Sequence, residues 1–382
     1  MKILLTSYMD QESSSGVRVY CTRLKAALEN AGHEVRLVTP SCAPRLARWV
    51  TGAFRRGAGW GGPCPNLIAS ELKCWGRIFA ATRALHWKPD IVHAQDPGSA
   101  SAVRMALGAA VPMVVTCHFN ENLADEALNQ AGIPGAAAAG LRRWHAWTFR
   151  QTWNWIAVSR YAAECLRRYI PAAAPIRVIH NGVDFSAAKV CADPLITQRY
   201  NGLVRILNVG SLESRKNQIL ILAVAECLRE LPVQFLLAGE GPDKGMLEQV
   251  ILQRGLKDKV CFLGYRRDIL SVMRACDIYL HVAKRENCPF VILEALAAGL
   301  PVMSVASGGI RELLETTAER VLIEDSASPQ TIADRLSAWI RQPELREVLI
   351  CGQYEYAVAQ FSSESVLKKT ELCYQEILND TV

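Results

Sequence analysis

The 382-residue sequence lacks the long apolar runs and paired cysteines that mark membrane-spanning and disulfide-bonded proteins. No uncharged apolar run reaches the ~18–20 residues needed to cross a bilayer. The longest, from Met105 to Cys117, is interrupted by Gly108 and Pro112. The apolar stretch at the N-terminus is too short for a secretory signal. The 13 cysteines are scattered without a Cys-x-x-Cys pair, which argues against a disulfide scaffold or a zinc site and favours a reducing cytoplasm.

Charge and tryptophan are distributed unevenly along the chain. Residues 1–190 carry 22 Lys and Arg against 12 Asp and Glu, whereas residues 191–382 carry 21 against 25. Eight of the nine tryptophans precede residue 190. A basic, tryptophan-rich half indicates a domain that faces an anionic partner such as a membrane, a nucleic acid or a phosphorylated substrate. A nucleic acid is disfavoured, because no recognised binding module accompanies the charge.

Short β-branched runs alternate with helical patterns, which is typical of βαβ units and parallel sheets. The sequence therefore predicts an α/β protein with two doubly wound, Rossmann-like domains at residues 1–190 and 191–360. Residues 361–382 form a C-terminal helix that we expect to cross back to the first domain. The aperiodic stretch Asp184–Gly202 is expected to be a linker, and the insertion Ser41–Ser70 is expected to be a loop that is either functional or mobile. The expected strands are Lys2–Thr6, Glu34–Val38, Ile91–Ala94, Met113–Cys117, Trp155–Val158, Ile176–Ile179, Val204–Val209, Val233–Ala238, Val260–Leu263, Ile278–Val282, Pro301–Val305 and Val321–Ile323.

The strongest chemical signal follows the strand Ile278–Val282 and opens a helix. Pro289 suits a first helical turn, so the amides of Phe290 and Val291 would form an anion site at the positive end of the helix dipole. Glu286 precedes this turn and Glu294 lies one turn into the helix. Two carboxylates beside an anion site repel the ligand unless they bind hydroxyl groups, so a ligand with both a diphosphate and sugars is indicated. The alternative is that both glutamates merely solvate a helix end.

A basic pair and several glycines follow other strands of the second domain. Arg215 and Lys216 lie where a strand gives way to a helix, a position suited to phosphate oxygens, although a basic pair on a loop is also typical of a solvated surface. Gly239 and Gly264 end two further strands, where the missing side chain permits close approach of a base or a phosphate.

In order, these motifs resemble the retaining glycosyltransferase family 4. They are the segment from Val209 to Asn217, the Gly-Glu-Gly-Pro turn ending at Pro242, the Phe-Leu-Gly-Tyr turn ending at Tyr265, Glu286 spaced eight residues from Glu294, and the Ser-Gly-Gly turn beginning at Ser307. The resemblance covers nearly the whole chain and implies the GT-B fold, in which two Rossmann-like domains face a cleft.

The resemblance also implies roles for single residues. Glu286 would hold hydroxyls of the donor sugar, and Glu294 would bind the ribose. Arg215 and Lys216 would neutralise the donor diphosphate, together with the amides of Phe290 and Val291. The remaining implied residues are His118 near the anomeric centre, Gly16 against the sugar and phosphate, and Gly264 and Tyr265 against the base.

The implied reaction transfers a sugar from a nucleoside diphosphate to an acceptor hydroxyl with retention at the anomeric carbon. UDP-glucose is the expected co-substrate, no further cofactor is expected, and the acceptor is expected to be a sugar or lipid-linked sugar of envelope or polysaccharide assembly. The chain has no Asp-x-Asp pair, so a metal is not needed to explain charge neutralisation. The alternatives are a nucleotide-sugar 2-epimerase of the same fold and a non-catalytic nucleotide-sugar-binding protein.

Two segments of the first half mix arginine with aromatic residues. One combines Arg45, Arg48, Arg55 and Arg56 with Trp49, Phe54 and Trp60; the other runs from Leu141 to Trp153. This mixture suits a bilayer interface, so we expect peripheral association of a cytoplasmic protein with the inner face of the membrane. The alternatives are aromatic side chains packed in the core and a loop that lines the acceptor site.

Overall fold

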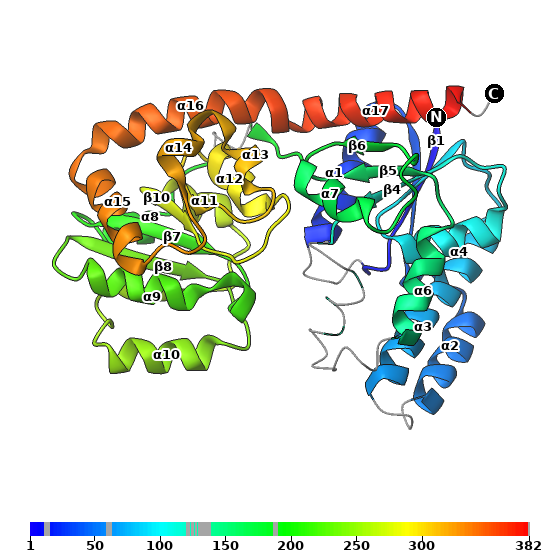
Figure 1. Cartoon of the computed structure of the whole chain (residues 1–382), viewed down its shortest axis with the longest axis horizontal. Helices are drawn as coiled ribbons and strands as arrows, with labels where there is room; N and C mark the ends of the chain where they lie inside the picture. The colour runs from blue at the N-terminus through cyan, green and yellow to red at the C-terminus, as the bar shows by residue number, and fades with distance from the viewer. Residues whose placement is uncertain are drawn as a thin grey trace. The chain divides into compact units, whose positions relative to one another are not determined.

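The structure is a computed structural model that describes residues 1–10, 16–58, 63–119, 123, 126, 128, 139–185 and 190–380. The chain divides into two compact units (Figure 1). Unit 1 contains Met1–Asn181 and Val366–Val382, and unit 2 contains Gly182–Ser365. The domain limits that the sequence suggested, at residues 190 and 360, thus differ by several residues from the limits of these units.

Unit 1 is built on a six-stranded parallel sheet of order β2-β1-β3-β4-β5-β6. Its central strands are apolar runs buried on both faces, as expected for parallel strands covered by helices. Its strands are β1 (Lys2–Thr6), β2 (Glu34–Val38), β3 (Ile91–Ala94), β4 (Met113–Cys117), β5 (Asn154–Ala157) and β6 (Ile176–Val178). Its helices are α1 (Gly16–Asn30), η1 (Pro40–Cys42), α2 (Arg45–Ala58), α3 (Pro63–Arg83), α4 (Pro97–Leu107), α6 (Ala139–Phe149), α7 (Arg160–Arg167) and α17 (Ser363–Asn379).

The C-terminal helix α17 is bonded to unit 1 by three side chains. The hydroxyl of Tyr374 lies 2.6 Å from Nδ1 of the buried His93 in β3. Glu371 lies 2.7 Å from Nε2 of His33, and Glu376 accepts a 2.7 Å hydrogen bond from Arg177. These contacts join the end of the chain to the first sheet.

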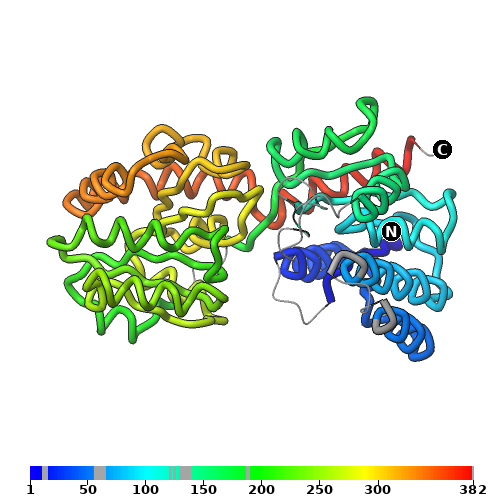
Figure 2. Tube along the Cα trace, turned by 60° about the horizontal axis from the view of Figure 1, so that its bottom comes forward, coloured from blue at the N-terminus to red at the C-terminus, as the bar shows by residue number. Residues whose placement is uncertain are grey.

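The described residues of the insertion Ser41–Ser70, which was predicted as a loop, are mostly helical instead. They form α2 and the first turns of α3, and these two helices run side by side (Figure 2). Thr51 of α2 accepts a 3.1 Å hydrogen bond from Arg77 of α3, and Ala47 packs against the core. Because Ala47 and Thr51 lie four residues apart on one helical face, their packing favours a helix over an open loop.

Unit 2 repeats the design with a parallel sheet of order β12-β11-β10-β7-β8-β9. Its strands are β7 (Val204–Val209), β8 (Val233–Ala238), β9 (Val260–Gly264), β10 (Ile278–His281), β11 (Val302–Val305) and β12 (Leu322–Ile323). Its helices are α8 (Pro194–Arg199), η5 (Ser214–Lys216), α9 (Gln218–Cys227), α10 (Lys244–Gln253), α11 (Ile269–Arg274), α12 (Phe290–Ala297), α13 (Ile310–Leu313), η6 (Glu315–Thr317), α14 (Ala318–Val321), α15 (Pro329–Arg341) and α16 (Pro343–Phe361). The strand order reverses between β7 and β10, and ligands of doubly wound folds bind at this kind of switch point.

The predicted strands agree with the observed ones to within about one residue, but the predicted linker does not. Helix α8 lies inside it, and its first amides, at Leu195 and Ile196, donate to the side chain of Asp193. Asp193 is itself held by a 2.6 Å ion pair with Arg266 of unit 2, so this part of the stretch packs onto unit 2. Among the described residues, no helix is both long and apolar enough to span a bilayer.

Candidate active site

Two loops meet at the switch point of the second sheet. One follows β7 and carries Arg215 and Lys216 in the short helix η5; the other follows β10 and carries Glu286. The amide of Lys284 donates a 3.0 Å hydrogen bond to the carbonyl of Arg215, which fixes the two loops side by side. The sequence motifs that lie far apart in the chain are therefore neighbours in the fold.

Glu286 is the centre of this arrangement. Its side chain is one-tenth exposed and accepts hydrogen bonds from Nζ of Lys216 and, at 3.2 Å, from Nη1 of Arg215. Burial opposes the charged carboxylate, but the charges of Lys216 and Arg215 outweigh it and hold the pKa of Glu286 below its ordinary value. Glu286 is thus a buried carboxylate that two cations keep ionised.

His281 is a residue of this site that the sequence analysis missed. It ends β10, is fully buried, and its Nε2 lies 4.0 Å from a carboxylate oxygen of Glu286. Burial lowers the pKa of His281 to about 4, so the ring is neutral at pH 7. Its position at the carboxyl end of a parallel strand was the available signal, because such ends line the ligand crevice.

Helix α12 begins at Phe290, directly after Pro289, as the motif predicted. The amides of Phe290 and Val291 belong to the first turn of this helix and lie at the positive end of its dipole. Glu294 is half-buried one turn further along α12. These three residues therefore lie on the helix that follows Glu286.

Two glycines allow the neighbouring loops to approach closely. Gly239 has φ +150°, and a Cβ on it would lie 1.9 Å from the carbonyl oxygen of Gly210, so a side chain does not fit. Gly264 has φ +66°, and its carbonyl accepts a 2.8 Å hydrogen bond from the amide of Gly239. Tyr265 follows with 65% of its surface exposed. The carboxyl ends of β7, β8 and β9 thus lie together at one edge of the second sheet.

The remaining predicted residues lie in unit 1. Gly16 is the first residue of α1, and His118 follows β4. Nε2 of His118 lies 3.0 Å from the amide oxygen of Gln95, and its ring meets the edge of Tyr20 of α1 at a centroid distance of 4.8 Å. Burial lowers the pKa of His118 to about 4, so the ring is neutral at pH 7.

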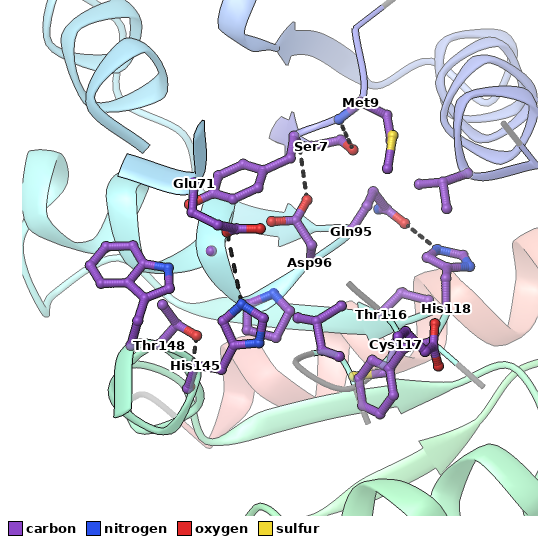
Figure 3. A pocket seen from close by; sticks show the side chains of 18 residues that line it. Ser7, Met9, Glu71, Gln95, Asp96, Thr116, Cys117, His118, His145 and Thr148 are labelled. Atoms are coloured by element: carbon purple, nitrogen blue, oxygen red, sulfur yellow. Dashed lines mark hydrogen bonds and ion pairs between the residues drawn. The ribbon is translucent and has the colours of Figure 1, made fainter. Parts of the chain in front are cut away.

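His118 lines a cavity of about 210 Å³ in unit 1 (Figure 3). The cavity contains titratable side chains that the sequence analysis did not single out, among them Tyr8, Glu71, Asp96 and His145. Asp96 lies two residues after the end of β3, and this strand-end position was a usable signal. Glu71 and His145 lie on the helices α3 and α6, and no local pattern marks them.

Family models and known proteins agree with this architecture. A model described as Glycosyltransferase Family 4 matches residues 14–187, and one described as Glycosyl transferases group 1 matches residues 196–355. The chain is 28% identical over 340 residues to the glycogen synthase of Mycobacterium tuberculosis, covering 82% of this chain and 80% of that protein. It is 26% identical over 178 residues to the N-acetyl-alpha-D-glucosaminyl L-malate synthase of Bacillus anthracis, covering 47% of this chain and 46% of that one.

Solved structures share the fold at low sequence identity. HepE of Anabaena, solved in complex with UDP, superposes with a TM-score of 0.71 at 21% identity, over 98% of this chain and 100% of that one. The same protein has also been solved with UDP-glucose, with a TM-score of 0.69 to this chain at 20% identity and full coverage of both. Two consecutive family models and two six-stranded parallel sheets therefore confirm the predicted fold, and the chain belongs to glycosyltransferase family 4, with the GT-B fold.

Proposed function

We propose that the chain is a retaining glycosyltransferase that moves glucose from UDP-glucose to a hydroxyl of a sugar or lipid-linked sugar, in envelope or polysaccharide assembly. The observation that carries this proposal is the buried Glu286 carboxylate, paired with Lys216 and Arg215 at the switch point of unit 2. Cations and a carboxylate side by side suit a ligand that joins a diphosphate to a sugar.

On donor binding, the two cations would turn from Glu286 to the diphosphate. Lys216 and Arg215 then neutralise phosphate oxygens, together with the amides of Phe290 and Val291 at the start of α12. Glu286, released from its cations, accepts hydrogen bonds from hydroxyls of the donor sugar. Glu294 accepts hydrogen bonds from the ribose hydroxyls. Lys216 and Arg215 stay in the site throughout and only change partner, from Glu286 to the diphosphate.

In the reaction, the bond between the anomeric carbon and the diphosphate oxygen breaks and leaves the electron pair on that oxygen. The acceptor oxygen bonds to the same face of the anomeric carbon, and its proton passes to the departing diphosphate oxygen. The negative charge that develops on the diphosphate is stabilised by fixed cations and amides that need no reorganisation. No covalent nucleophile and no metal ion enter this scheme.

Uracil as the base and glucose as the sugar are supported by HepE, whose structures contain UDP and UDP-glucose. Gly264 ends β9 and Tyr265 follows it, at the same edge as Gly239, and both would lie against the base. In unit 1, Gly16 and the neutral His118 would approach the sugar. A neutral imidazole donates or accepts a hydrogen bond without attracting the diphosphate.

A thermal-shift screen tests the donor assignment. A ligand that binds only the folded protein raises its apparent stability by about 2.7 kcal/mol at one hundred times its Kd. We expect UDP and UDP-glucose to raise the melting temperature, and GDP-mannose to raise it less. Equal shifts with every nucleotide sugar would contradict the base assignment, and no shift with any of them would contradict the proposed donor site.

We further propose that α2 binds the inner face of an anionic membrane. Leu46, Trp49, Val50 and Phe54 are exposed by 73%, 68%, 51% and 55%, and their spacing aligns them along one side of the helix. Arg45, Arg48 and Arg55 of the same helix are exposed, and Arg56 lies outside the described side chains. Basic residues near anionic lipid contribute about 1 kcal/mol each, and the apolar stripe inserts among the headgroups.

In the second arginine-aromatic segment, Trp153 is exposed but Trp144 and Trp147 are half-buried. The rings of Trp144 and Trp147 of α6 stack with their centroids 5.1 Å apart. The centroid of each also lies 6.3 Å from that of Trp75 of α3. The core-packing alternative therefore describes these two tryptophans, and the membrane proposal rests on α2 alone.

Co-sedimentation with vesicles tests the membrane proposal. We expect binding to vesicles that contain phosphatidylglycerol, little binding to phosphatidylcholine alone, and release at high salt. Trp49→Ser should reduce binding at least threefold, whereas Trp153→Ser, which removes a 51% exposed tryptophan outside α2, should not. Equal binding to both vesicle types, or equal loss in both variants, would contradict the proposal.

A further inference from the structure

The cavity of unit 1 lies at the carboxyl edge of the first sheet, between that sheet and the helices α3 and α6 (Figure 3). Ser7 and Tyr8 follow β1, Gln95 and Asp96 follow β3, and His118 follows β4. Its volume of about 210 Å³ is enough to hold a sugar-sized ring.

Several buried polar atoms in the cavity have no hydrogen-bond partner within the part of the chain that the structure describes. They include both ring nitrogens of His145, the hydroxyl of Tyr8 and the amide nitrogen of Gln95. His145 is only 5% exposed, and a buried polar group without a hydrogen-bond partner destabilises the fold. Unpartnered groups that face a cavity indicate a ligand that supplies the missing bonds.

Glu71 and His145 face each other across this space (Figure 3). Oε2 of Glu71 lies 4.0 Å from Nε2 of His145, which is too far for a direct hydrogen bond but short enough for one oxygen atom to bond both. A ligand hydroxyl at that point would donate to one of the two groups and accept from the other. Asp96 is already engaged, since it accepts from the amides of Tyr8 at 2.8 Å and Ser99 at 2.6 Å.

The charge of the lining selects against anions. The described lining residues include the carboxyl groups of Glu71, Asp96 and Glu126 but no lysine or arginine. Burial and the charge of Asp96 raise the pKa of Glu71 to about 7, and burial lowers that of His145 to about 4. His145 therefore brings no positive charge at pH 7, and a phosphate in this cavity would meet repulsion without a cation to offset it.

The apolar part of the lining suits a sugar ring. Trp144 and Phe119 line the cavity beside the polar groups. Aromatic rings pack against the apolar faces of other groups, while nearby polar atoms bind hydroxyls and fix orientation. A charged amine would donate to the carboxyl groups and to the unprotonated nitrogen of His145, but it has no lone pair to accept a hydrogen bond from the N–H of that ring, whereas a hydroxyl does both.

We propose that this cavity binds an uncharged, hydroxyl-bearing ring of the acceptor, with Glu71 and His145 sharing one hydroxyl, and that it rejects anionic sugars. This inference rests on the proposed glycosyltransferase activity. It assigns to Glu71 and His145 a role in acceptor specificity and none in donor chemistry.

Ligand-observed saturation-transfer NMR tests the binding directly, using the methyl α-glycosides of glucose, galactose, mannose and N-acetylglucosamine as probes. We expect at least one glycoside to bind the wild-type protein. Its affinity should fall at least tenfold in His145→Phe, which keeps the bulk of the ring, and at least threefold in Glu71→Gln. The exposed Glu164→Gln, on α7, is the matched control and should stay within twofold of the wild type. Glucose 6-phosphate and glucosamine, as anionic and cationic probes, should bind at least tenfold more weakly.

The two proposals fail in different ways. If His145→Phe binds every glycoside as the wild type does, or if glucose 6-phosphate binds as tightly as the glycosides, the cavity inference is wrong. Release of UDP from UDP-glucose without acceptor would then still support the glycosyltransferase. If the melting temperature shows that His145→Phe does not fold, Glu71→Gln takes its place, and glycoside affinity equal to that of the wild type would then show that the cavity inference is wrong. If the wild type does not release UDP from UDP-glucose, the proposed function is contradicted instead.

Discussion

Replacing Lys216 by methionine should destabilise unit 2 because it leaves a buried carboxylate with one cation fewer. Removing one partner of a buried ion pair costs about 3–5 kcal/mol. Arg215 remains 3.2 Å from Glu286, but its side chain is 41% exposed and therefore screened by solvent. We expect the free energy of unfolding to fall by about 3 kcal/mol, at the lower end of this range. For a unit of this size, that lowers the melting temperature by roughly 6–12 °C.

The pH dependence of this effect follows from Glu286. Its pKa in the folded protein lies below the ordinary value, so its contribution to stability is present above the ordinary pKa and lost as the pH falls through the folded one. In Lys216→Met, one of the opposing charges is gone and burial raises the pKa of Glu286. The difference between variant and wild type should therefore be largest at neutral pH and shrink as the medium is acidified.

Calorimetry, with hydrogen exchange of β7 and β10 to assign the transition to unit 2, measures the effect. The double variant Lys216→Met/Glu286→Gln should recover about 1–3 kcal/mol relative to the single change, since no charge is left unpaired. Lys244→Met is the control, because it breaks an exposed pair with Glu240 and should cost under about 0.5 kcal/mol. A Lys216→Met protein as stable as the wild type, or no recovery in the double variant, would refute this reasoning.

Three further changes probe the site and the fold. Glu286→Ala should reduce sugar transfer at least tenfold, a barrier increase above ~1.4 kcal/mol, while circular dichroism stays unchanged; near-normal turnover would remove Glu286 from the site. Gly239→Ala should lower the melting temperature by several degrees because its Cβ has no space, whereas Gly245→Ala, with nothing within 4 Å, should not; equal melting would contradict the observed packing. Tyr374→Phe should cost about 1–3 kcal/mol in urea unfolding by leaving Nδ1 of the buried His93 unpaired, and unaltered stability would show that this bond is not needed.

The strands were readable from the sequence because buried parallel strands appear as short apolar runs between turns. The insertion at Ser41–Ser70 was wrongly predicted as a loop because it contains Pro44, Gly52 and Gly57, and proline and glycine are typical of turns and loops. Its helical period was present in Leu46, Trp49, Val50 and Phe54, but that stripe is exposed, so no expected core partner supported it. Helix α8 was missed because six residues are too few to establish a period.

The donor-side residues were predictable and the cavity residues were not. Arg215, Lys216 and Glu286 each follow a strand, and the carboxyl ends of parallel strands converge at one edge, so their meeting could be expected. Glu71 and His145 come from the middle of two helices, and only the packing of α3 and α6 against the first sheet brings them together. The partnerless nitrogens of His145 are a tertiary property that no local motif records.

Product analysis by proton NMR tests the central claim most directly. UDP-glucose, UDP-N-acetylglucosamine and GDP-mannose are each incubated without acceptor, with the wild type and with Glu286→Ala. The proposed retaining transferase predicts slow release of UDP from UDP-glucose by the wild type, with the α-anomer of glucose appearing first, and at least tenfold less release by Glu286→Ala. A changed sugar still attached to its nucleotide would identify an epimerase, and no release from any donor, or equal release by both proteins, would contradict the account.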